Sequence, residues 1–196
     1  DLDAMAEAAL RERASLVFIC NPGNPSGEAI PAVAIKTLAE RLRGKALLVV
    51  DAAYAEFADT DDCVALLDAT DNVVILRTLS KAHALAAARI GSVIAAPEVI
   101  AMLQRCQAPY PLAQPAVEAA LSALAPDALA RTRRAAGQVR DERERLRQRL
   151  QGVAGVRRVY PSQGNFLLVR FRDAQAAFDA LLAAGIVVRD MRATPG

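Results

Sequence analysis

Short apolar runs recur along the first half of the chain, and polar or turn residues follow each of them. Three runs lie at 16–20, 47–50 and 73–76, and a fourth apolar segment spans 89–96. Their length and their content of valine, isoleucine and leucine predict buried strands.

Between these runs, the apolar positions recur at helical spacing. Residues 3–13 are strong helix formers, and the stretch between Pro31 and Gly44 places four apolar residues on one helix face. Further helices are predicted at 64–67 and 97–107. Because strands alternate with helices, the pattern predicts an α/β fold with a mostly parallel sheet.

The composition changes after residue 108, where three prolines within seven residues interrupt the pattern. Helices are predicted at 114–125, 127–151 and 173–184. Strands are predicted at 156–160, 166–171 and 186–188, and Gly185 is expected to end the last helix. We therefore expect residues 1–108 to form one domain, and 109–196 to supply connecting helices and a second, smaller α/β domain.

Two of the later helices carry apolar residues in a stripe. The long helix has this stripe on a heavily charged rod, and the last helix is predicted to be amphipathic with its stripe inward. The stripe of the long helix comprises Val139, Leu146, Leu150 and Val153, and that of the last helix comprises Phe178, Leu181 and Leu182. The run at 140–149 mixes charges of both signs, and we interpret it as a solvated face.

Composition excludes several classes of function. With 54% hydrophobic residues the chain is globular, and its net charge of +2 comes without a basic block interleaved with aromatics, so a nucleic-acid partner is not predicted. No apolar run is long enough to cross a membrane. Three separated cysteines suit a reducing compartment such as the cytoplasm, and neither they nor the polar loop at 59–62 has metal-site spacing.

Each of the first three predicted strands ends in a segment with chemically capable side chains. These are Asn24 after the first strand, Asp51 and Tyr54 after the second, and Thr78, Ser80 and Lys81 after the third. Ligands of open parallel sheets bind outside the carboxyl ends of the strands. We therefore expect these groups to converge on one crevice.

Lys81 is the lysine whose surroundings suggest chemistry, since Lys36 falls on a helical pattern and Lys45 in a turn. A lysine amine forms a Schiff base, which an arginine cannot do. A nearby carboxylate suits a pyridinium nitrogen, and hydroxyls together with Arg89 suit a phosphate. This set of groups predicts a site for pyridoxal 5'-phosphate (PLP).

Five motifs support the same interpretation. They are NPGNPSG at 21–27, DAAY at 51–54, TLSK at 78–81 with RIG at 89–91, SQGNF at 162–166 and GIVVRD at 185–190. In this order they resemble motifs of the fold-type-I PLP-dependent aminotransferases, and most closely of the histidinol-phosphate aminotransferase family. The resemblance covers nearly the whole chain. It implies the aspartate aminotransferase-like fold, with 1–108 in the large PLP-binding domain and 109–196 in the connecting helices and small domain.

The resemblance also implies a role for each matching cofactor residue. Lys81 would be the Schiff-base lysine and the later proton shuttle, and Asp51 would keep the pyridine nitrogen protonated. Tyr54 and Asn24 would bond the phenolic oxygen of PLP. The phosphate would be bound by Thr78, Ser80 and Arg89.

For the substrate, the resemblance implies contacts with Arg189 and Asn165. The implied reaction moves an amino group from histidinol phosphate to 2-oxoglutarate, as a step of histidine biosynthesis in a cytoplasmic homodimer. Because the family's amino-terminal third and the carboxylate-binding arginine beyond residue 196 have no counterpart here, we expect the chain to be part of a longer protein.

The sequence departs from the family pattern at three places. His83 and Ala84 stand where the family commonly has Phe-Gly, residues 86–88 are three alanines in place of L-A-G-L, and Gly164 replaces a common alanine. Alanine adopts a positive φ less readily than glycine, so the turn after Lys81 is expected to be looser.

Several alternatives stay open on the sequence alone. Tyr54 could be a core tyrosine, Arg89 a structural ion pair and Asn24 a turn residue, while Arg189 could be solvated and Asn165 could hold a strand edge. The chain could belong to another fold-type-I enzyme, such as an aromatic or aspartate aminotransferase or a threonine-phosphate decarboxylase. It could also be a non-catalytic module that keeps the fold.

Overall fold

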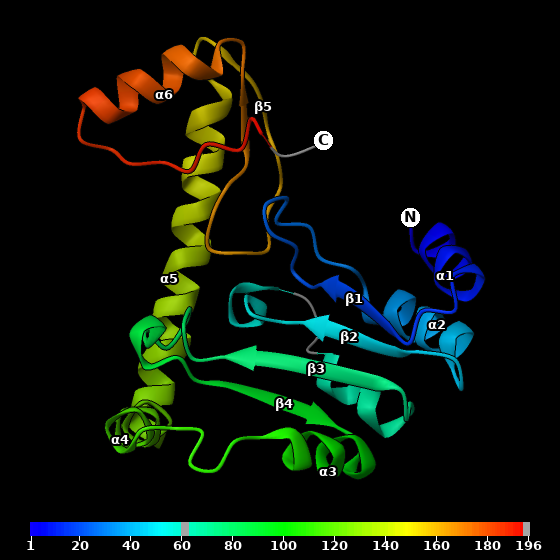
Figure 1. Cartoon of the computed structure of the whole chain (residues 1–196). Coiled ribbons are helices and arrows are strands. Elements are labelled where there is room, and N and C mark those ends of the chain that lie inside the picture. Colours follow the sequence, from blue (N-terminus) through cyan, green and yellow to red (C-terminus); the bar gives the residue numbers. More distant parts are fainter. Residues whose placement is uncertain (60–62, 194–196) are drawn as a thin grey trace.

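The computed structural model describes residues 1–59 and 63–193 (Figure 1). Its main sheet contains, in spatial order, β1 (Leu16–Cys20), β2 (Leu47–Asp51), β3 (Val73–Thr78) and β4 (Gly91–Ala95). The first three strands are parallel, and β4 runs antiparallel to β3. The mostly parallel sheet is confirmed. Of the predicted polar loop at 59–62, only Asp59 lies within the described residues.

Helices α1 (Leu2–Arg11) and α2 (Ala32–Leu42) contribute to the core on one face of this sheet. α1 begins after Asp1, whose carboxylate accepts hydrogen bonds from the amides of Asp3 and Ala4 at 2.9 and 3.2 Å. The largest fully buried side chains are Ile35, Leu38, Leu42, Leu48, Val50, Val73 and Ile75. Each stabilises the fold by roughly 1.5–3 kcal/mol relative to an exposed side chain.

Strand β1 shows the two-residue period of a sheet with one covered face. Val17 and Ile19 are buried on the side of the helices, whereas Leu16 and Phe18 are 50% and 61% exposed on the other side. The apolar run at 16–20 is therefore buried on one face alone.

Three helices follow the sheet: α3 (Pro97–Cys106), α4 (Gln114–Ala123) and α5 (Pro126–Gln151). α5 is a rod of 26 residues that passes the end of the sheet toward which β1, β2 and β3 point (Figure 1). None of the helices in the described ranges is both long enough and apolar enough to cross a membrane.

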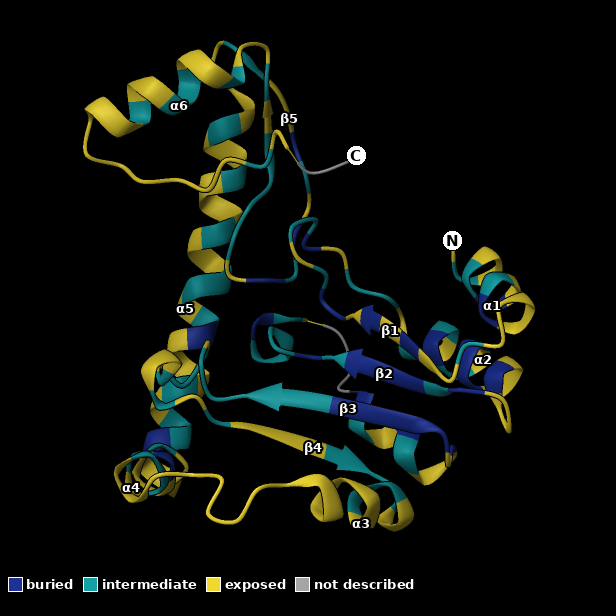
Figure 2. Ribbon diagram, in the orientation of Figure 1, coloured by how far each residue is buried: buried dark blue, intermediate teal, exposed yellow. Residues whose placement is uncertain are grey.

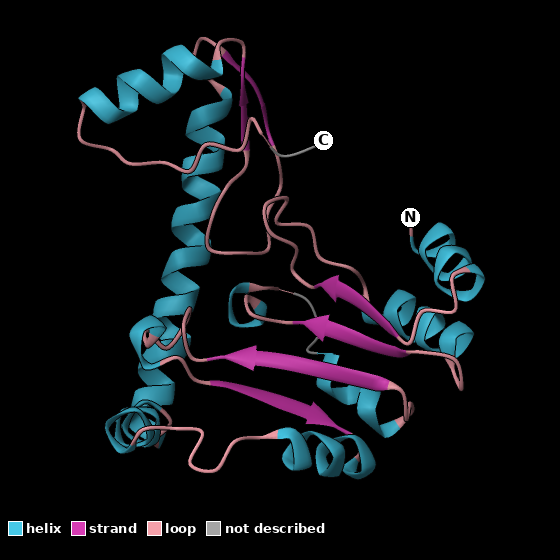
Figure 3. Cartoon of the chain, viewed as in Figure 1, coloured by secondary structure: helices cyan, strands magenta, loops and turns pink. Residues whose placement is uncertain are grey.

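A second, two-stranded antiparallel sheet lies toward the far end of α5. It consists of β5 (Val156–Val159) and β6 (Val169–Phe171), followed by α6 (Ala174–Ala183). The predicted strand at 186–188 is wrong, because this segment is a loop in which Val187 is 83% exposed (Figure 3). No strand in the described part of the chain pairs with it, so its backbone groups do not enter a ladder.

The predicted apolar stripe of the long helix is only partly covered, since Val139 and Leu150 are half-buried. Leu146 and Val153 are 50% and 47% exposed, and the buried residues of α5 are Ala128 and Ala136. On α6, Leu182 is 52% exposed. Figure 2 shows the same contrast, with buried residues concentrated in the main sheet and exposed residues along α6 and the loop after it.

Candidate active site

The carboxyl ends of β1, β2 and β3 lie in one row. In the parallel register Cys20 pairs with Asp51, and Asp51 pairs with Leu76. Backbone hydrogen bonds continue past the strand ends, from the Asn21 amide to the Asp51 carbonyl at 2.8 Å and from the Ala52 amide to the Leu76 carbonyl at 2.9 Å. The segments that carry the predicted site residues therefore start from neighbouring positions.

The loop after β1 is held closed from within. The buried side chain of Asn21 accepts from the Ile30 amide at 2.7 Å and donates to the Ile30 carbonyl at 3.1 Å. The Gly27 amide donates to the Gly23 carbonyl at 2.8 Å. This closure leaves the side chain of Asn24 exposed at the tip, where its Nδ2 donates to the hydroxyl of Tyr54 at 3.0 Å.

Tyr54 stands where the three segments meet. Its hydroxyl oxygen accepts from Asn24, so the hydroxyl proton is available for another acceptor. The Nζ of Lys81 lies 5.3 Å from the ring centroid of Tyr54. The structure thus brings together Asn24, Tyr54 and Lys81 from three different strand ends.

Asp51 is the last residue of β2 and is partly buried. Its carboxylate accepts from the Ala53 amide at 3.1 Å, which orients it at the strand end. The pKa of the neighbouring Cys20 thiol is raised, first by burial and then by the charge of Asp51. Asp51 therefore places a negative charge at the middle of the row of strand ends.

The segment after β3 is folded around its own hydroxyls. The Thr78 hydroxyl accepts from the Ser80 amide at 3.1 Å and lies 2.9 Å from the Ser80 hydroxyl. The Leu79 amide donates to the Ile90 carbonyl at 3.1 Å, which joins this segment to the start of β4. Two hydroxyls consequently lie side by side immediately before Lys81.

The turn beyond Lys81 uses left-handed backbone at non-glycine residues. Ala84 and Arg89 both have φ of 56°. Ala84 is one of the positions where the sequence departs from the family pattern. Its backbone does take a positive φ, which alanine adopts with strain. Nη1 of Arg89 donates to the Ala86 carbonyl at 2.9 Å, and the residue is exposed. The arginine is thereby held near the end of the turn, with further donors left for a ligand.

The comparison with known proteins is decisive for the family. Residues 1–195 match the family described as aminotransferase class I and II.

The chain belongs to this aminotransferase family.

Individual aminotransferases and related enzymes agree with the assignment. The chain is 58% identical, over its whole length, to a histidinol-phosphate aminotransferase of Xanthomonas campestris pv. campestris. It covers 54% of that protein, so it spans about half the length of the curated relatives it matches.

Two solved structures have similar folds. The histidinol-phosphate aminotransferase of Sinorhizobium meliloti, in complex with pyridoxal-5'-phosphate, matches with a TM-score of 0.85 and 32% identity over 96% of this chain and 52% of that one. A decarboxylase from Sulfurospirillum multivorans matches with a TM-score of 0.85 and 28% identity over 98% of this chain and 57% of that one. The expected PLP-dependent aminotransferase fold is confirmed.

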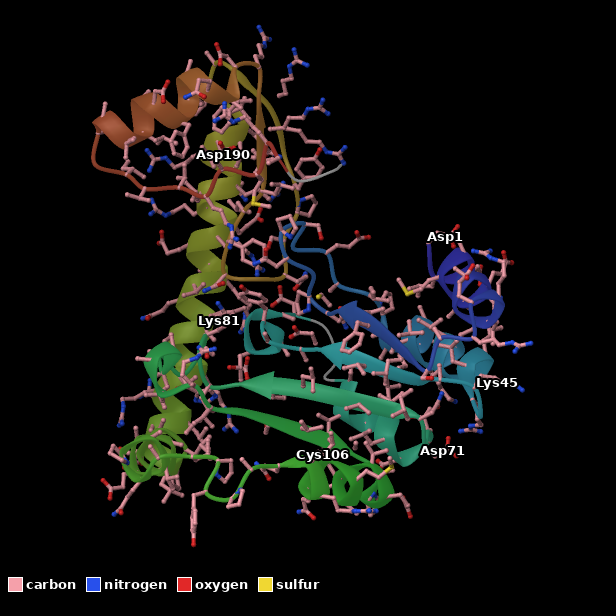
Figure 4. All side chains as sticks on the ribbon, viewed as in Figure 1. Asp1, Lys45, Asp71, Lys81, Cys106 and Asp190 are labelled. Atoms are coloured by element: carbon pink, nitrogen blue, oxygen red, sulfur yellow. The ribbon has the colours of Figure 1, made fainter. Side chains whose placement is uncertain are left out.

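Two predicted residues of this aminotransferase chain are not joined to the others. The side chains of Asn165 and Arg189 are exposed, and neither forms a hydrogen bond or ion pair with any residue that the structure describes. Asp190, next to Arg189, lies toward α6 and well separated from Lys81 (Figure 4). Their substrate contacts stay a prediction.

Phe166 was not predicted as a site residue but contacts Tyr54. Its ring meets that of Tyr54 edge-on, with centroids 5.1 Å apart and an interplanar angle of 81°. Phe166 also folds over Gly164, where an added Cβ would lie 2.6 Å from Cε1 of the ring. The glycine in place of the family's common alanine therefore leaves room for this ring. The motif SQGNF was the available signal, but it was interpreted through Asn165.

Arg143, in the charged run at 140–149, was also not predicted as a site residue. Its side chain is only 10% exposed, so the interpretation of this run as a solvated face is wrong at this position. Mixed charges at helical spacing do not distinguish an arginine that faces solvent from one that faces a neighbouring segment.

Proposed function

We propose that this chain supplies the PLP-binding part of an aminotransferase that moves an amino group from histidinol phosphate to 2-oxoglutarate. The products would be imidazole-acetol phosphate and glutamate, as in histidine biosynthesis. The observation that carries the proposal is the convergence of Asn24, Tyr54 and Lys81 beside Asp51 at the carboxyl ends of three parallel strands. The choice of substrate is supported by the 58% identity to a relative named histidinol-phosphate aminotransferase.

The residues present fit PLP by their chemistry. The Asp51 carboxylate, partly buried and oriented by the Ala53 amide, suits the pyridinium nitrogen. The Tyr54 hydroxyl keeps a proton for the ring oxygen because Asn24 occupies its acceptor side. The adjacent hydroxyls of Thr78 and Ser80, with Arg89, suit the phosphate.

Lys81 is the proposed catalytic residue. Its amine would hold the cofactor covalently and, once the substrate takes that place, would move the proton at the substrate α-carbon. PLP, when bound, supplies the electron sink for this proton transfer. Arg189 and Asn165 are proposed to bind substrate, and the assembly is proposed to be a cytoplasmic homodimer with its large-domain part at residues 1–108.

A decarboxylase is the second candidate, because the fold of a solved decarboxylase matches this chain as well as that of the S. meliloti aminotransferase. The two activities would use the same cofactor residues and differ at the bond that breaks. The 58% identity to a named aminotransferase favours transamination.

The test uses the protein expressed from its complete reading frame. Titration with PLP is expected to produce a visible absorption band that disappears in Lys81→Ala and persists in the control Lys45→Ala. The product assay then compares histidinol phosphate, aromatic amino acids and threonine phosphate as substrates. A band that survives Lys81→Ala refutes the site, and release of carbon dioxide without transamination favours the decarboxylase.

A further inference from the structure

Arg143 projects from α5 into the junction between the main sheet and the second sheet. Its Nη1 donates to the Gly164 carbonyl at 2.8 Å and to the Phe57 carbonyl at 3.2 Å, and its Nη2 lies 3.4 Å from Oδ2 of Asp59. Burial lowers the pKa of this guanidinium, and the Asp59 charge opposes that effect. A buried charge with three acceptors is a specific arrangement, since an unpaired buried arginine would be costly.

The two carbonyls belong to segments that contact Tyr54. Phe57 belongs to the 3-10 turn at Ala55–Phe57, and its amide donates to the Tyr54 carbonyl at 3.0 Å. Gly164 lies two residues before Phe166, whose ring packs edge-on against Tyr54. Arg143 therefore holds both the backbone that follows Tyr54 and the segment that packs on its ring.

A second set of bonds closes the arrangement from the other side. The Asp59 amide donates to Oε1 of Gln163 at 2.7 Å, and the Gln163 amide donates to the Gly27 carbonyl at 2.7 Å. Gly27 ends the loop that carries Asn24, the donor to the Tyr54 hydroxyl. The contacts of Tyr54 thus depend on segments that Arg143 and its partner Asp59 tie together.

We propose that Arg143 is a positioning residue, which fixes the hydroxyl of Tyr54 for the ring oxygen of PLP; this inference rests on the proposed function. The planar guanidinium serves the role because it donates to two carbonyls and a carboxylate in fixed directions. If the contacts of Arg143 only stabilised the fold, removing them would not change the proton equilibrium at Lys81.

The experiment compares Arg143→Gln with Arg145→Gln in the protein expressed from its complete reading frame. Arg145 is the matched control because it lies on the same helix, is 61% exposed and pairs with Glu142. Hydrogen exchange in peptides covering 54–59 and 162–166 is expected to be roughly tenfold faster in R143Q than in R145Q.

The second readout is the midpoint pH of the visible band of bound PLP. The Tyr54 hydroxyl stabilises negative charge on the ring oxygen, so a displaced hydroxyl makes the Lys81 nitrogen hold its proton to higher pH. The midpoint is expected to rise by roughly half to one pH unit in R143Q and to stay at the wild-type value in R145Q. Arg143→Lys, which keeps the charge but not the planar donor set, is expected to show a smaller rise.

Three results would overturn the inference. Unchanged hydrogen exchange in R143Q would show that the contacts of Arg143 do not order the segments 54–59 and 162–166. Faster exchange with an unchanged midpoint would leave Arg143 a structural residue only. If R143Q does not fold, an unchanged midpoint pH of the PLP band in R143K would likewise leave Arg143 a structural residue only. A missing PLP band in the unmodified protein would instead overturn the proposed function, and this inference with it.

Discussion

The main sheet and the region around α6 are both rich in apolar residues, but they differ in what covers those residues. In the sheet, Leu48, Val50 and Ile75 are fully buried because strands pair on both sides and α2 covers one face. Beyond α6, Ile186 and Val187 are 52% and 83% exposed in a loop. The comparison teaches that an apolar run becomes a buried strand only where a neighbouring strand and a covering layer are present.

The largest expected effect separates these regions by the same substitution. Ile75→Ala removes a fully buried side chain and is expected to lower the free energy of unfolding by about 2–5 kcal/mol. Ile186→Ala removes a side chain that is 52% exposed and is expected to change it by less than about 0.5 kcal/mol. Denaturant unfolding of both variants measures the difference, and equal losses would contradict the contrast in burial.

The next effect tests where the loop after β1 touches Ser162, in the segment between β5 and β6. Gly27 has φ of +74°, and an added Cβ would lie 2.2 Å from Oγ and 2.8 Å from Cα of Ser162. Gly27→Ala is therefore expected to cost about 2–4 kcal/mol, from backbone strain and overlap together. Gly44→Ala is the matched control, since Gly44 has φ of +69° with nothing within 4 Å.

Thermal melts of the two glycine variants check this prediction. Gly44→Ala is expected to show only the conformational cost of about 1–2 kcal/mol. If both variants lose the same stability, the contact between the loop at 21–27 and Ser162 does not contribute to stability. The main sheet and the second sheet would then be less tightly joined than the structure indicates.

The smallest expected effect lies on the exposed side of α5. Hydrogen bonds from Arg147 and then Gln148 lower the pKa of Glu144 from 4.5 to about 2. Because the pKa is lower in the folded state, the stabilisation is present above about pH 4.5 and is lost as the pH falls toward 2. Glu144→Gln should flatten the decline in stability across this interval.

Unfolding curves recorded from pH 5 to pH 2.5 measure that slope. Glu7→Gln is the control, because Glu7 is exposed and forms no ion pair among the described residues. Since the side chain of Glu144 is 48% exposed, added salt should reduce the difference further. An unchanged slope in Glu144→Gln would show that the helix-surface pair is not populated in solution.

Much of the main sheet could be predicted from the sequence because its signals are local. The runs that became β1, β2 and β3 begin and end within a few residues of the expected positions, and turn residues such as Gly44 mark their limits. The antiparallel direction of β4 was not predicted. The chain reverses in the segment between Thr78 and Gly91, where Ala84 and Arg89 adopt left-handed backbone.

The second half was harder because its strands and faces depend on distant partners. The stripe containing Leu146 follows helical spacing, yet Leu146 is 50% exposed whereas Val139 and Leu150 are half-buried. The strand predicted at 166–171 is shorter because Phe166 leaves the ladder and packs on Tyr54. Periodicity along one segment carries no information about such contacts.

The candidate site shows the same division. Asn24, Tyr54 and Lys81 were predictable because each follows a strand in a motif whose residue types indicate a PLP site. Arg143 and Gln163 were not, because their importance comes from distant backbone groups. Arg143 bonds to carbonyls 21 and 86 residues away, and Gln163 bonds to an amide 104 residues away. The cofactor roles of Asn24, Tyr54 and Lys81 stay predictions.

The most direct test of the central hypothesis is to find which lysine holds PLP. The chain has three lysines, so borohydride reduction of the PLP-loaded protein expressed from its complete reading frame, followed by peptide mass spectrometry, has three possible sites of attachment within these residues. The proposed function predicts the reduced pyridoxyl phosphate on Lys81, with Lys36 and Lys45 unmodified at stoichiometric PLP. Attachment at Lys36 or Lys45, or no attachment at all, would contradict a PLP site at the carboxyl ends of β1, β2 and β3.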